Sequence, residues 1–331
     1  MRLRRQGARA RGASPRRDRG IALVLALWLT VLLTVIASGF AFSMRGEALA
    51  ARNAISLAQA RAAADGAVER AVYELSRPRL PDAWGPDGAR HTWMEGETQY
   101  LVTAVDEAAR IDLNFANDLL LKGLLTTIGG LDDLGAAKVL DAIVDWRDAD
   151  DLRRPNGAEE ADYRAANLKY GPSNAPFETV SELSRVLGVT PELFRKIAPS
   201  LTVYSRQPGI NAATAPRDVL LAVPNATADA VDDYIDRRRE ALENRLPPPP
   251  FVPAQAFGST PVPVWRIHAE TQLPDGVTFV REAVVRPTTD ARRPLTALAW
   301  MEAARLPVAA PPVAQNSLST PSLLKSARDG R

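Results

Sequence analysis

The chain contains no cysteine, and its 331 residues include only two histidines and 6% aromatic residues. Without cysteine it has no disulfide, no thiolate metal site and no cysteine nucleophile. Its stability must therefore come from its core, from bound ions or from partners.

Signals of catalysis are also scarce. The two histidines, His91 and His268, are far apart in the sequence. The chain has neither a G-x-S-x-G nucleophile motif nor a phosphate-binding loop. Paired acidic residues can hydrolyse glycosides, but nothing in the sequence places them in a substrate groove. We therefore do not expect this protein to be an enzyme.

The first 42 residues are the most informative part of the chain. A basic segment with eight Arg and one Asp ends in Gly20 and runs into an uncharged, mostly apolar block, residues 21–42. A 22-residue helix spans roughly 33 Å, and the hydrocarbon core of a bilayer is about 30 Å thick. The block therefore predicts a transmembrane helix, whose backbone hydrogen bonds are all internal.

The charge of the chain depends on that basic segment. The whole chain carries a net charge of +2, but the residues after Gly20 include 33 basic and 38 acidic residues, a net charge of −5. The basic isoelectric point is therefore no sign of nucleic-acid binding. Basic residues beside a span stay on its cytoplasmic side, so we expect the residues after Phe42 to lie on the other side.

The junction at Gly20 resembles a type IV prepilin signal. An ordinary secretory signal has a shorter apolar core with a small-residue cleavage site after it. In prepilins a peptidase cuts after the glycine on the cytoplasmic side and keeps the apolar helix. The resemblance implies processing between Gly20 and Ile21, with methylation of the new N-terminus. A plain signal anchor with a chance glycine is the alternative.

The helical pattern continues beyond the predicted membrane span. Residues 43–77 are rich in Ala, Leu, Glu and Arg, with apolar residues at an approximately helical spacing, and Pro78 ends the segment. We expect one helix from about Ile21 to Ser76, roughly 84 Å long. A coiled-coil stalk is the alternative, which the abundant Ala at its seam positions disfavours.

The remaining chain predicts a small antiparallel sheet that a helical region interrupts. Residues 77–97 are expected to form a loop, and the alternating residues Thr98–Glu107 a strand. A hairpin of residues 265–285 turns at Pro274-Asp275-Gly276. A proline-rich connector, Leu246–Gln255, precedes this hairpin. From about Leu306 the chain has no periodicity and is expected to be disordered.

The helical region contains an internal repeat. Its units start at Ile111 and Ile210, and each has an Asp or Asn next, an Ala five residues after the Ile, and two helices around a turn. They resemble helix–hairpin–helix modules, which bind the DNA backbone in other proteins. Two of the three hairpins in this region lack a paired glycine turn, and their surroundings are not uniformly basic. We therefore favour a structural scaffold over a nucleic-acid site.

An acidic loop, residues 145–163, is the strongest chemical constellation in the chain. A hard cation such as Ca²⁺ takes oxygen ligands, and carboxylates held together without a counter-charge repel one another. The spacing is not that of an EF-hand. The alternative is a solvated loop neutralised by Arg147, Arg153 and Arg154. We predict a calcium site there, and its predicted ligands are Asp145, Asp148, Asp150, Asp151, Glu159 and Asp162.

The order of these features, with D-W-R-D-A-D and G-A-E-E-A-D-Y in the acidic loop as the most specific part, resembles the K-type minor pseudopilins of type II secretion systems. The likeness covers nearly all of the chain after Gly20. It implies an α+β fold: a pilin-like long N-terminal helix and a small antiparallel sheet, with a large inserted α-helical domain of helix-hairpin-helix-like units. It also implies a calcium-bearing loop, which coincides with the acidic loop.

The same resemblance implies a role and a location. The role is that of a subunit at the tip of the pseudopilus, together with the I and J minor pseudopilins, which initiates or caps assembly for protein export. The location is a single-pass anchor in the inner membrane with a periplasmic head. Further implied partners are the prepilin peptidase and the inner-membrane assembly platform, and no nucleic acid is expected. A minor pilin of a type IV pilus is the alternative, which the large helical insert disfavours. A membrane-anchored DNA-binding protein is a third.

The sequence patterns, together with this resemblance, predict seven segments. They are a prepilin leader (1–20), a transmembrane segment (21–42), its amphipathic continuation (43–77), a first part of the head (78–110), an inserted α-domain (111–245), a second part of the head (246–305) and a tail (306–331).

The fifth residue after Gly20 bears on the position in the assembly. Most pilins carry a glutamate there, which pairs with the free N-terminal amine of the subunit ahead and lowers the cost of burying that charge. This chain has Leu25 instead. A subunit without that acid has no counter-ion to offer, so it suits the first position. Alternatively, Leu25 is one more apolar anchor residue.

Overall fold

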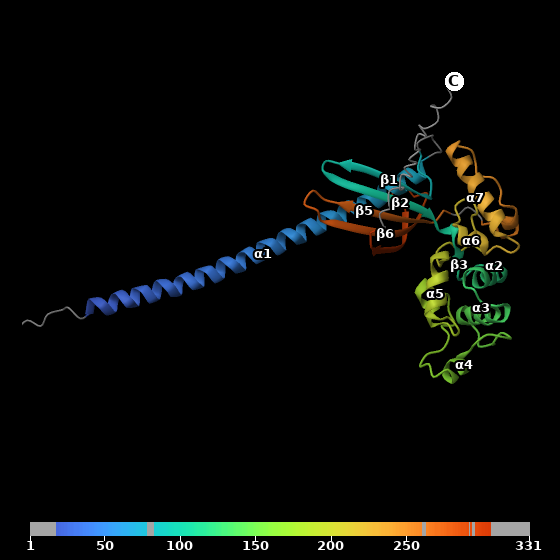
Figure 1. The fold of residues 1–331 in the computed structure, drawn as a ribbon, viewed down its shortest axis with the longest axis horizontal. Helices are drawn as coiled ribbons and strands as arrows, with labels where there is room; N and C mark the ends of the chain where they lie inside the picture. The colour runs from blue at the N-terminus through green and yellow to red at the C-terminus, as the bar shows by residue number, and fades with distance from the viewer. Residues whose placement is uncertain (1–17, 78–82, 260–262, 291, 293–294, 306–331) are drawn as a thin grey trace, which may run out of the picture.

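The computed structural model describes residues 18–77, 83–259, 263–290, 292 and 295–305. Most of the predicted leader and the whole predicted tail, residues 1–17 and 306–331, lie outside the described residues. The described chain forms a long helix, a sheet packed on the second half of that helix, and a helical insert at the far end of the sheet (Figure 1).

The long helix α1, Asp18–Ser76, confirms the single helix that the sequence predicts. Its first half extends away from the rest of the molecule (Figure 1). The apolar side chains there are exposed, Leu23 at 75% and Trp28 at 70%. Within the described residues, α1 is the one helix that is long and apolar enough to cross a membrane. This exposure fits a lipid environment, because no part of the head covers the helix here.

The sheet has five antiparallel strands in the order β1-β2-β5-β6-β7. Its strands are β1 (Asp87–Glu95), β2 (Thr98–Asp106), β5 (Trp265–Gln272), β6 (Thr278–Pro287) and β7 (Leu295–Glu302). The predicted strand is β2, and the predicted hairpin is β5 and β6. The expectation of a loop over residues 77–97 was wrong, because β1 lies within it. Gly96, at φ 59°, starts the two-residue turn into β2, a conformation that glycine adopts without strain.

Small side chains on α1 allow the sheet to pack closely against it. Ala60, Ala64, Ala67 and Ala71 recur every three or four residues and are at most 2% exposed. The hydroxyl of Thr271 on β5 donates to the backbone oxygen of Ala60 at 3.0 Å. This helix–sheet core is separate from the core of the insert.

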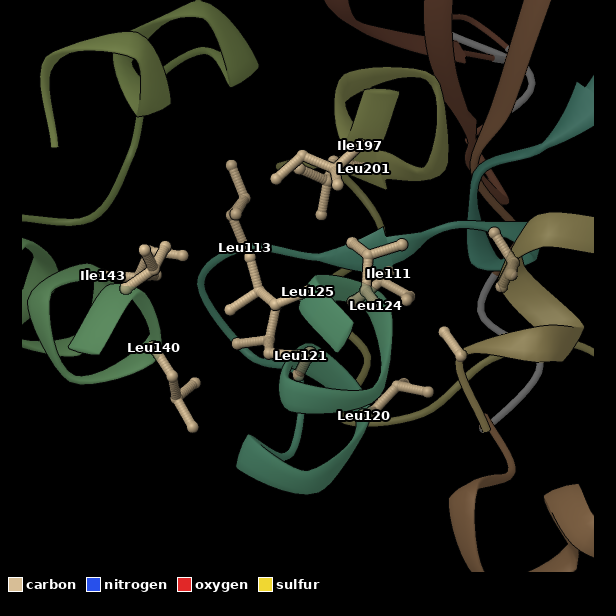
Figure 2. Close-up of a cluster of buried hydrophobic side chains, with 14 of the residues drawn as sticks. Ile111, Leu113, Leu120, Leu121, Leu124, Leu125, Leu140, Ile143, Ile197 and Leu201 are labelled. Atoms are coloured by element: carbon tan, nitrogen blue, oxygen red, sulfur yellow. The ribbon is translucent and has the colours of Figure 1, made fainter. Parts of the chain in front are cut away.

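The insert occupies the chain between β2 and β5. Its helices and strands are β3 (Ile111–Asp112), α2 (Asp118–Gly123), α3 (Asp133–Arg147), α4 (Glu160–Ala165), α5 (Pro191–Ile197), β4 (Leu201–Thr202), α6 (Arg217–Leu221) and α7 (Ala228–Glu243). A π-helical turn, Leu124–Ile128, extends α2. Short 3₁₀ turns lie at Glu107–Ala109, Val180–Arg185, Ala198–Ser200 and Val252–Phe257. Leucine and isoleucine side chains from α2, α3, β3 and β4 form its apolar centre (Figure 2).

The two units of the repeat adopt the same local backbone. Ile111 pairs with β4, and Ile210 pairs with Gly258, both in parallel. In each unit the alanine five residues after the isoleucine donates its backbone N–H to the backbone oxygen of the residue after the isoleucine. These bonds join Ala116 to Asp112 and Ala215 to Asn211, both at 2.9 Å. Both alanines are buried. The repeat read from the sequence is therefore a repeat of structure.

We expect Ala64→Leu to destabilise the head by about 1–3 kcal/mol, because the larger side chain has no space between α1 and the sheet. Thermal unfolding of the detergent-solubilised chain, followed by near-UV circular dichroism, measures the change. The control is Ala54→Leu, since Ala54 lies on the same helix and is exposed. Equal melting temperatures for the two variants would contradict this account of the packing.

Candidate functional site

The acidic loop joins the end of α3 to the start of α4. Asp145 lies in the last turn of α3 and is fully buried. Its two carboxylate oxygens accept the backbone N–H of Arg154, each at 3.2 Å. A Cβ on Gly157 would lie 1.9 Å from Oδ2 of Asp145, so only glycine lets the loop pass this close. Asp145 therefore determines how the loop folds back over the end of α3.

An aromatic cluster supports the loop from within the insert. Trp146, Tyr163, Tyr170 and Phe177 lie with ring centroids 5.9–6.5 Å apart. Tyr163 is fully buried, and its hydroxyl accepts the backbone N–H of Leu187 at 3.0 Å. Burial raises the pKa of Tyr163 to about 12. The acidic loop thus packs on a cluster of aromatic side chains, which we call the aromatic base.

Two carboxylates of the loop have oxygens that no described group satisfies. Oδ1 of Asp148 and Oε1 of Glu159 are buried, and neither has a hydrogen-bond partner among the described residues. Burial, followed by the charges of Asp145 and Asp148, raises the pKa of Glu159 from 4.5 to about 7. The pKa of Asp148 is also raised, first by burial and then by Asp150. An unpaired buried carboxylate is costly, so these oxygens call for a proton or a cation.

The other predicted ligands are engaged within the chain. Asp150 accepts the backbone N–H of Leu152, and Asp151 accepts from the side-chain amide of Asn174, both at 2.8 Å. Asp162 caps α4 by accepting the N–H of Glu159 at 3.0 Å and pairs with Arg153 at 3.0 Å. Asp162 therefore has a structural role whether or not an ion is bound.

Among the described residues, the arginines near the loop form no ion pair with the two unsatisfied carboxylates, although the charges of Arg154 and Arg147 act to lower the pKa of Asp148. Arg154 pairs with Asp118 at 3.0 Å and Asp141 at 3.4 Å. Arg147 donates to the backbone oxygen of Leu113. Among the described residues, neither arginine nor Arg153 forms an ion pair with Asp148 or Glu159. Arg153 and Arg154 thus pair with other carboxylates, and the loop keeps two buried carboxylate oxygens without a described hydrogen-bond partner.

The ligand set is not closed into a metal site. In the part of the chain that the structure describes, no group of three or more His, Asp or Glu side chains is arranged to hold a metal ion. The oxygen donors have the chemistry that a hard cation prefers, and two of them are unsatisfied, but their side chains have not converged. The six calcium ligands predicted from the sequence stay a prediction.

The anchor residues lie along α1. Gly20 and Ile21 are in its first turn and Leu25 follows one turn later, so the helix runs through the predicted processing site without a break. Ile21 and Leu25 are each 64% exposed. Between Ile21 and Phe42 the helix carries no charged side chain.

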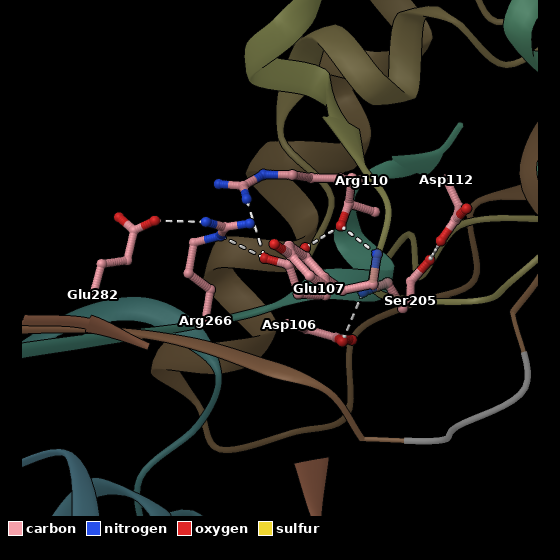
Figure 3. A network of polar contacts seen from close by, with 10 residues as sticks. Asp106, Glu107, Arg110, Asp112, Ser205, Arg266 and Glu282 are labelled. Atoms are coloured by element: carbon pink, nitrogen blue, oxygen red, sulfur yellow. Dashed lines mark hydrogen bonds and ion pairs between the residues drawn. The ribbon is translucent and has the colours of Figure 1, made fainter. Parts of the chain in front are cut away.

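A polar network at the root of the insert was not found from the sequence. Glu107 is fully buried, and its Oε1 lies 2.6 Å from Nε of Arg266 on β5 and 3.2 Å from Nη1 of Arg110 (Figure 3). The hydroxyl of Thr202 on β4 donates to its other oxygen. Arg266 also pairs with Glu282 on β6 at 2.5 Å. The only sequence signal was an acid at the end of the predicted strand Thr98–Glu107, which is a common place for one.

We expect the pH dependence of stability to report on Glu159. Its pKa is raised from 4.5 to about 7, so its contribution is full below about pH 4.5 and is lost as the pH rises through 7. When a chelator is present, the melting temperature of Glu159→Gln should fall less than that of the wild type between pH 4.5 and 7. At pH 8 the melting temperature of the variant should be the higher of the two.

The control for this experiment is Glu243→Gln at the exposed end of α7, which should leave the pH profile unchanged. Identical profiles for Glu159→Gln and the wild type would mean that Glu159 ionises as it does in the unfolded chain.

Comparisons with known proteins agree with the fold and with the sequence pattern. A family model described as type II secretion system protein K matches residues 101–206, which include most of β2, all of α3 and the acidic loop. The type II secretion system protein K of Klebsiella pneumoniae is 30% identical over 234 residues, 62% of this chain and 70% of that protein. The protein of the same name from Pectobacterium carotovorum subsp. carotovorum is 27% identical over 226 residues, 60% of this chain and 67% of that protein.

A solved structure shares the fold. It is a chain in the crystal structure of the GspK–GspI–GspJ complex of the enterotoxigenic Escherichia coli type 2 secretion system. It superposes with a TM-score of 0.56 at 16% identity, covering 77% of this chain and 99% of that chain. The long helix, the antiparallel sheet and the inserted helices thus form the predicted α+β, pilin-like fold. By its sequence and its architecture, the chain belongs to the type II secretion system protein K family and is a minor pseudopilin.

Proposed function

We propose that this pseudopilin occupies the tip of the type II secretion pseudopilus and initiates or caps its assembly with the I and J minor pseudopilins. The observation that carries the tip position is Leu25, which stands where most pilins offer a counter-ion to the subunit ahead. The apolar helix around it contains no other acid, so a neighbouring N-terminal amine would find no partner. The role is one of assembly, without catalysis.

The shape of the head supports the same position. The insert lies at the end of the sheet away from the apolar half of α1 (Figure 1). If α1 is anchored in the inner membrane with the head in the periplasm, the insert is the part farthest from the membrane. A bulky domain there leaves little room for another subunit above, as suits the first subunit of a filament.

The proposal includes the events before assembly. The prepilin peptidase cuts between Gly20 and Ile21, the new N-terminus is methylated, and the inner-membrane platform receives the processed subunit. The uncharged α1 residues from Ile21 to Phe42 support this route, because they can remain in the bilayer after the cut. The relative in the superposed structure was crystallised with GspI and GspJ, which supports the I and J pseudopilins as the partners.

We further propose that the acidic loop binds Ca²⁺ through Asp145, Asp148, Asp150 and Glu159, with Asp151 and Asp162 adjoining. The unsatisfied oxygens of Asp148 and Glu159 and the mutual repulsion of the carboxylates support this. A bound cation adds positive charge beside Asp148 and Glu159, with which the nearby arginines form no ion pair. Shifts of the loop and of its side chains, without a change in the aromatic base beneath, would bring the oxygens together.

Leu25→Glu is expected to leave the head folded but to reduce secretion, because the new acid offers a counter-ion and allows the subunit into the body of the filament. Export of a secreted enzyme and co-purification of the I and J pseudopilins measure the effect. The matched control is Leu29→Glu, one turn further along α1, which places the same charge out of register. Unchanged secretion and complex formation in Leu25→Glu would show that the missing acid has no role.

Adding Ca²⁺ is expected to raise the melting temperature of the head, and chelation to lower it. At a Ca²⁺ concentration a hundredfold above Kd, binding adds about 2.7 kcal/mol to the free energy of unfolding. Asp148→Asn and Glu159→Gln should shrink this shift, because each removes a charged ligand. Asp229→Asn, an exposed acid in the first turn of α7, is the control and should keep it. Equal shifts in all three variants would place the ion elsewhere.

A further inference from the structure

The described chain ends at Arg305, whose side chain lies on the face of the sheet that α1 leaves open. The N–H of Ala303 continues the β6–β7 pairing by donating to the oxygen of Val280 at 3.1 Å. Two residues later, Nε of Arg305 lies 2.8 Å from Oε1 of Glu270. Glu270 is on β5, and β6 lies between β5 and β7. The side chain of Arg305 therefore reaches past β6 to β5.

Alternation along the strands identifies this face. Thr271 on β5 donates to the backbone of α1, and Arg281 on β6 pairs with Asp65 of α1 at 2.6 Å. Their neighbours Glu270 and Val280 therefore point to the opposite face. Val280 is only 5% exposed there, although α1 is on the other side.

A groove adjoins Glu270 on this face of the sheet. Cross-strand pairing places Glu270 beside Leu101 of β2, and Leu101 beside Thr92 of β1. The groove has a volume of about 570 Å³. Its lining includes Thr92, Met94, Gln99, Leu101, Glu270 and Gln272. Met94 is 62% exposed, so the groove has an apolar wall that no described residue covers.

The next residues of the chain match the groove in length and chemistry. Two strand spacings of about 4.8 Å separate β5 from β1, and an extended chain advances about 3.3 Å per residue, so roughly three residues cross the groove. The three that follow Arg305 are Leu306, Pro307 and Val308, all apolar. Pro307 has no N–H to add to a strand ladder, which suits a segment that crosses a sheet face instead of extending an edge.

We propose that Leu306–Val308 docks in this groove as a strap, and that the ion pair between Arg305 and Glu270 sets its direction. The strap covers the apolar wall at Met94 and Leu101 and ties β7 to β1 across the sheet. It is an interaction within one chain and does not depend on the role at the pseudopilus tip.

The absence of cysteine makes disulfide trapping a clean test in the full chain. In Met94→Cys/Val308→Cys, mild oxidation of membranes should form an intrachain disulfide at least about tenfold faster than in the control pair, because docking raises the effective concentration of the thiols. The control is Tyr73→Cys/Val308→Cys. Tyr73 is 66% exposed and Met94 is 62% exposed, so the two thiols would be similarly accessible. Tyr73 lies on α1, which covers the other face of the sheet. Reducing and non-reducing gels measure the rates.

Adding Arg305→Glu to the test pair should slow trapping, and adding Glu270→Arg as well should restore it, because the ion pair is then rebuilt in reverse. Trapping of the test pair no faster than of the control pair would overturn the proposal. Disulfides formed only between chains would overturn it in favour of a second copy in the groove. Trapping that Arg305→Glu leaves unchanged would overturn the part given to the ion pair.

Discussion

The relation between the sheet and the insert depends on one buried carboxylate, Glu107. It is the first residue after β2, and its charge is taken out of water completely. Such burial costs several kcal/mol unless the charge is paired and hydrogen-bonded. Arg266, Arg110 and Thr202 meet this requirement from the sheet, from the start of the insert and from its second short strand. Three separate segments are thus held to one carboxylate, and this contact orients the insert relative to the sheet.

Short polar side chains have the corresponding task inside the insert. Asp112 accepts the backbone N–H groups of Asn114 and Arg206, both at 2.8 Å, and the hydroxyl of Ser205 at 3.1 Å, so it joins the first repeat unit to the chain after β4. Asn211 plays the equivalent part in the second unit and donates to Asp106 at 2.7 Å. The turns are therefore fixed by side chains, and the short helices need little stability of their own.

Sequence reasoning succeeded where a pattern is local. The long helix, the hairpin at Asp275-Gly276 and the repeat at Ile111 and Ile210 all follow from spacing and turn residues. It failed at β1, because residues 77–97 are rich in glycine and proline and the alternation of the strand covers only a few residues. The acidic loop was recognised by composition, but its pairings were not. Asp162 pairs with Arg153 and caps α4, and one oxygen of Glu159 is left unsatisfied, because the folded path of the loop decides both and composition does not show that path.

The register of β2 and β5 has a consequence for the origin of the fold. Asp106 and Trp265, the last residue before the insert and the first after it, are directly paired neighbours. The whole insert therefore stands where a hairpin needs only a turn. Lengthening a loop raises its closure entropy slowly, so a domain can grow at such a point without disturbing the strands on either side. The insert can then diverge, or be exchanged between relatives, while α1 and the five-stranded sheet stay unchanged.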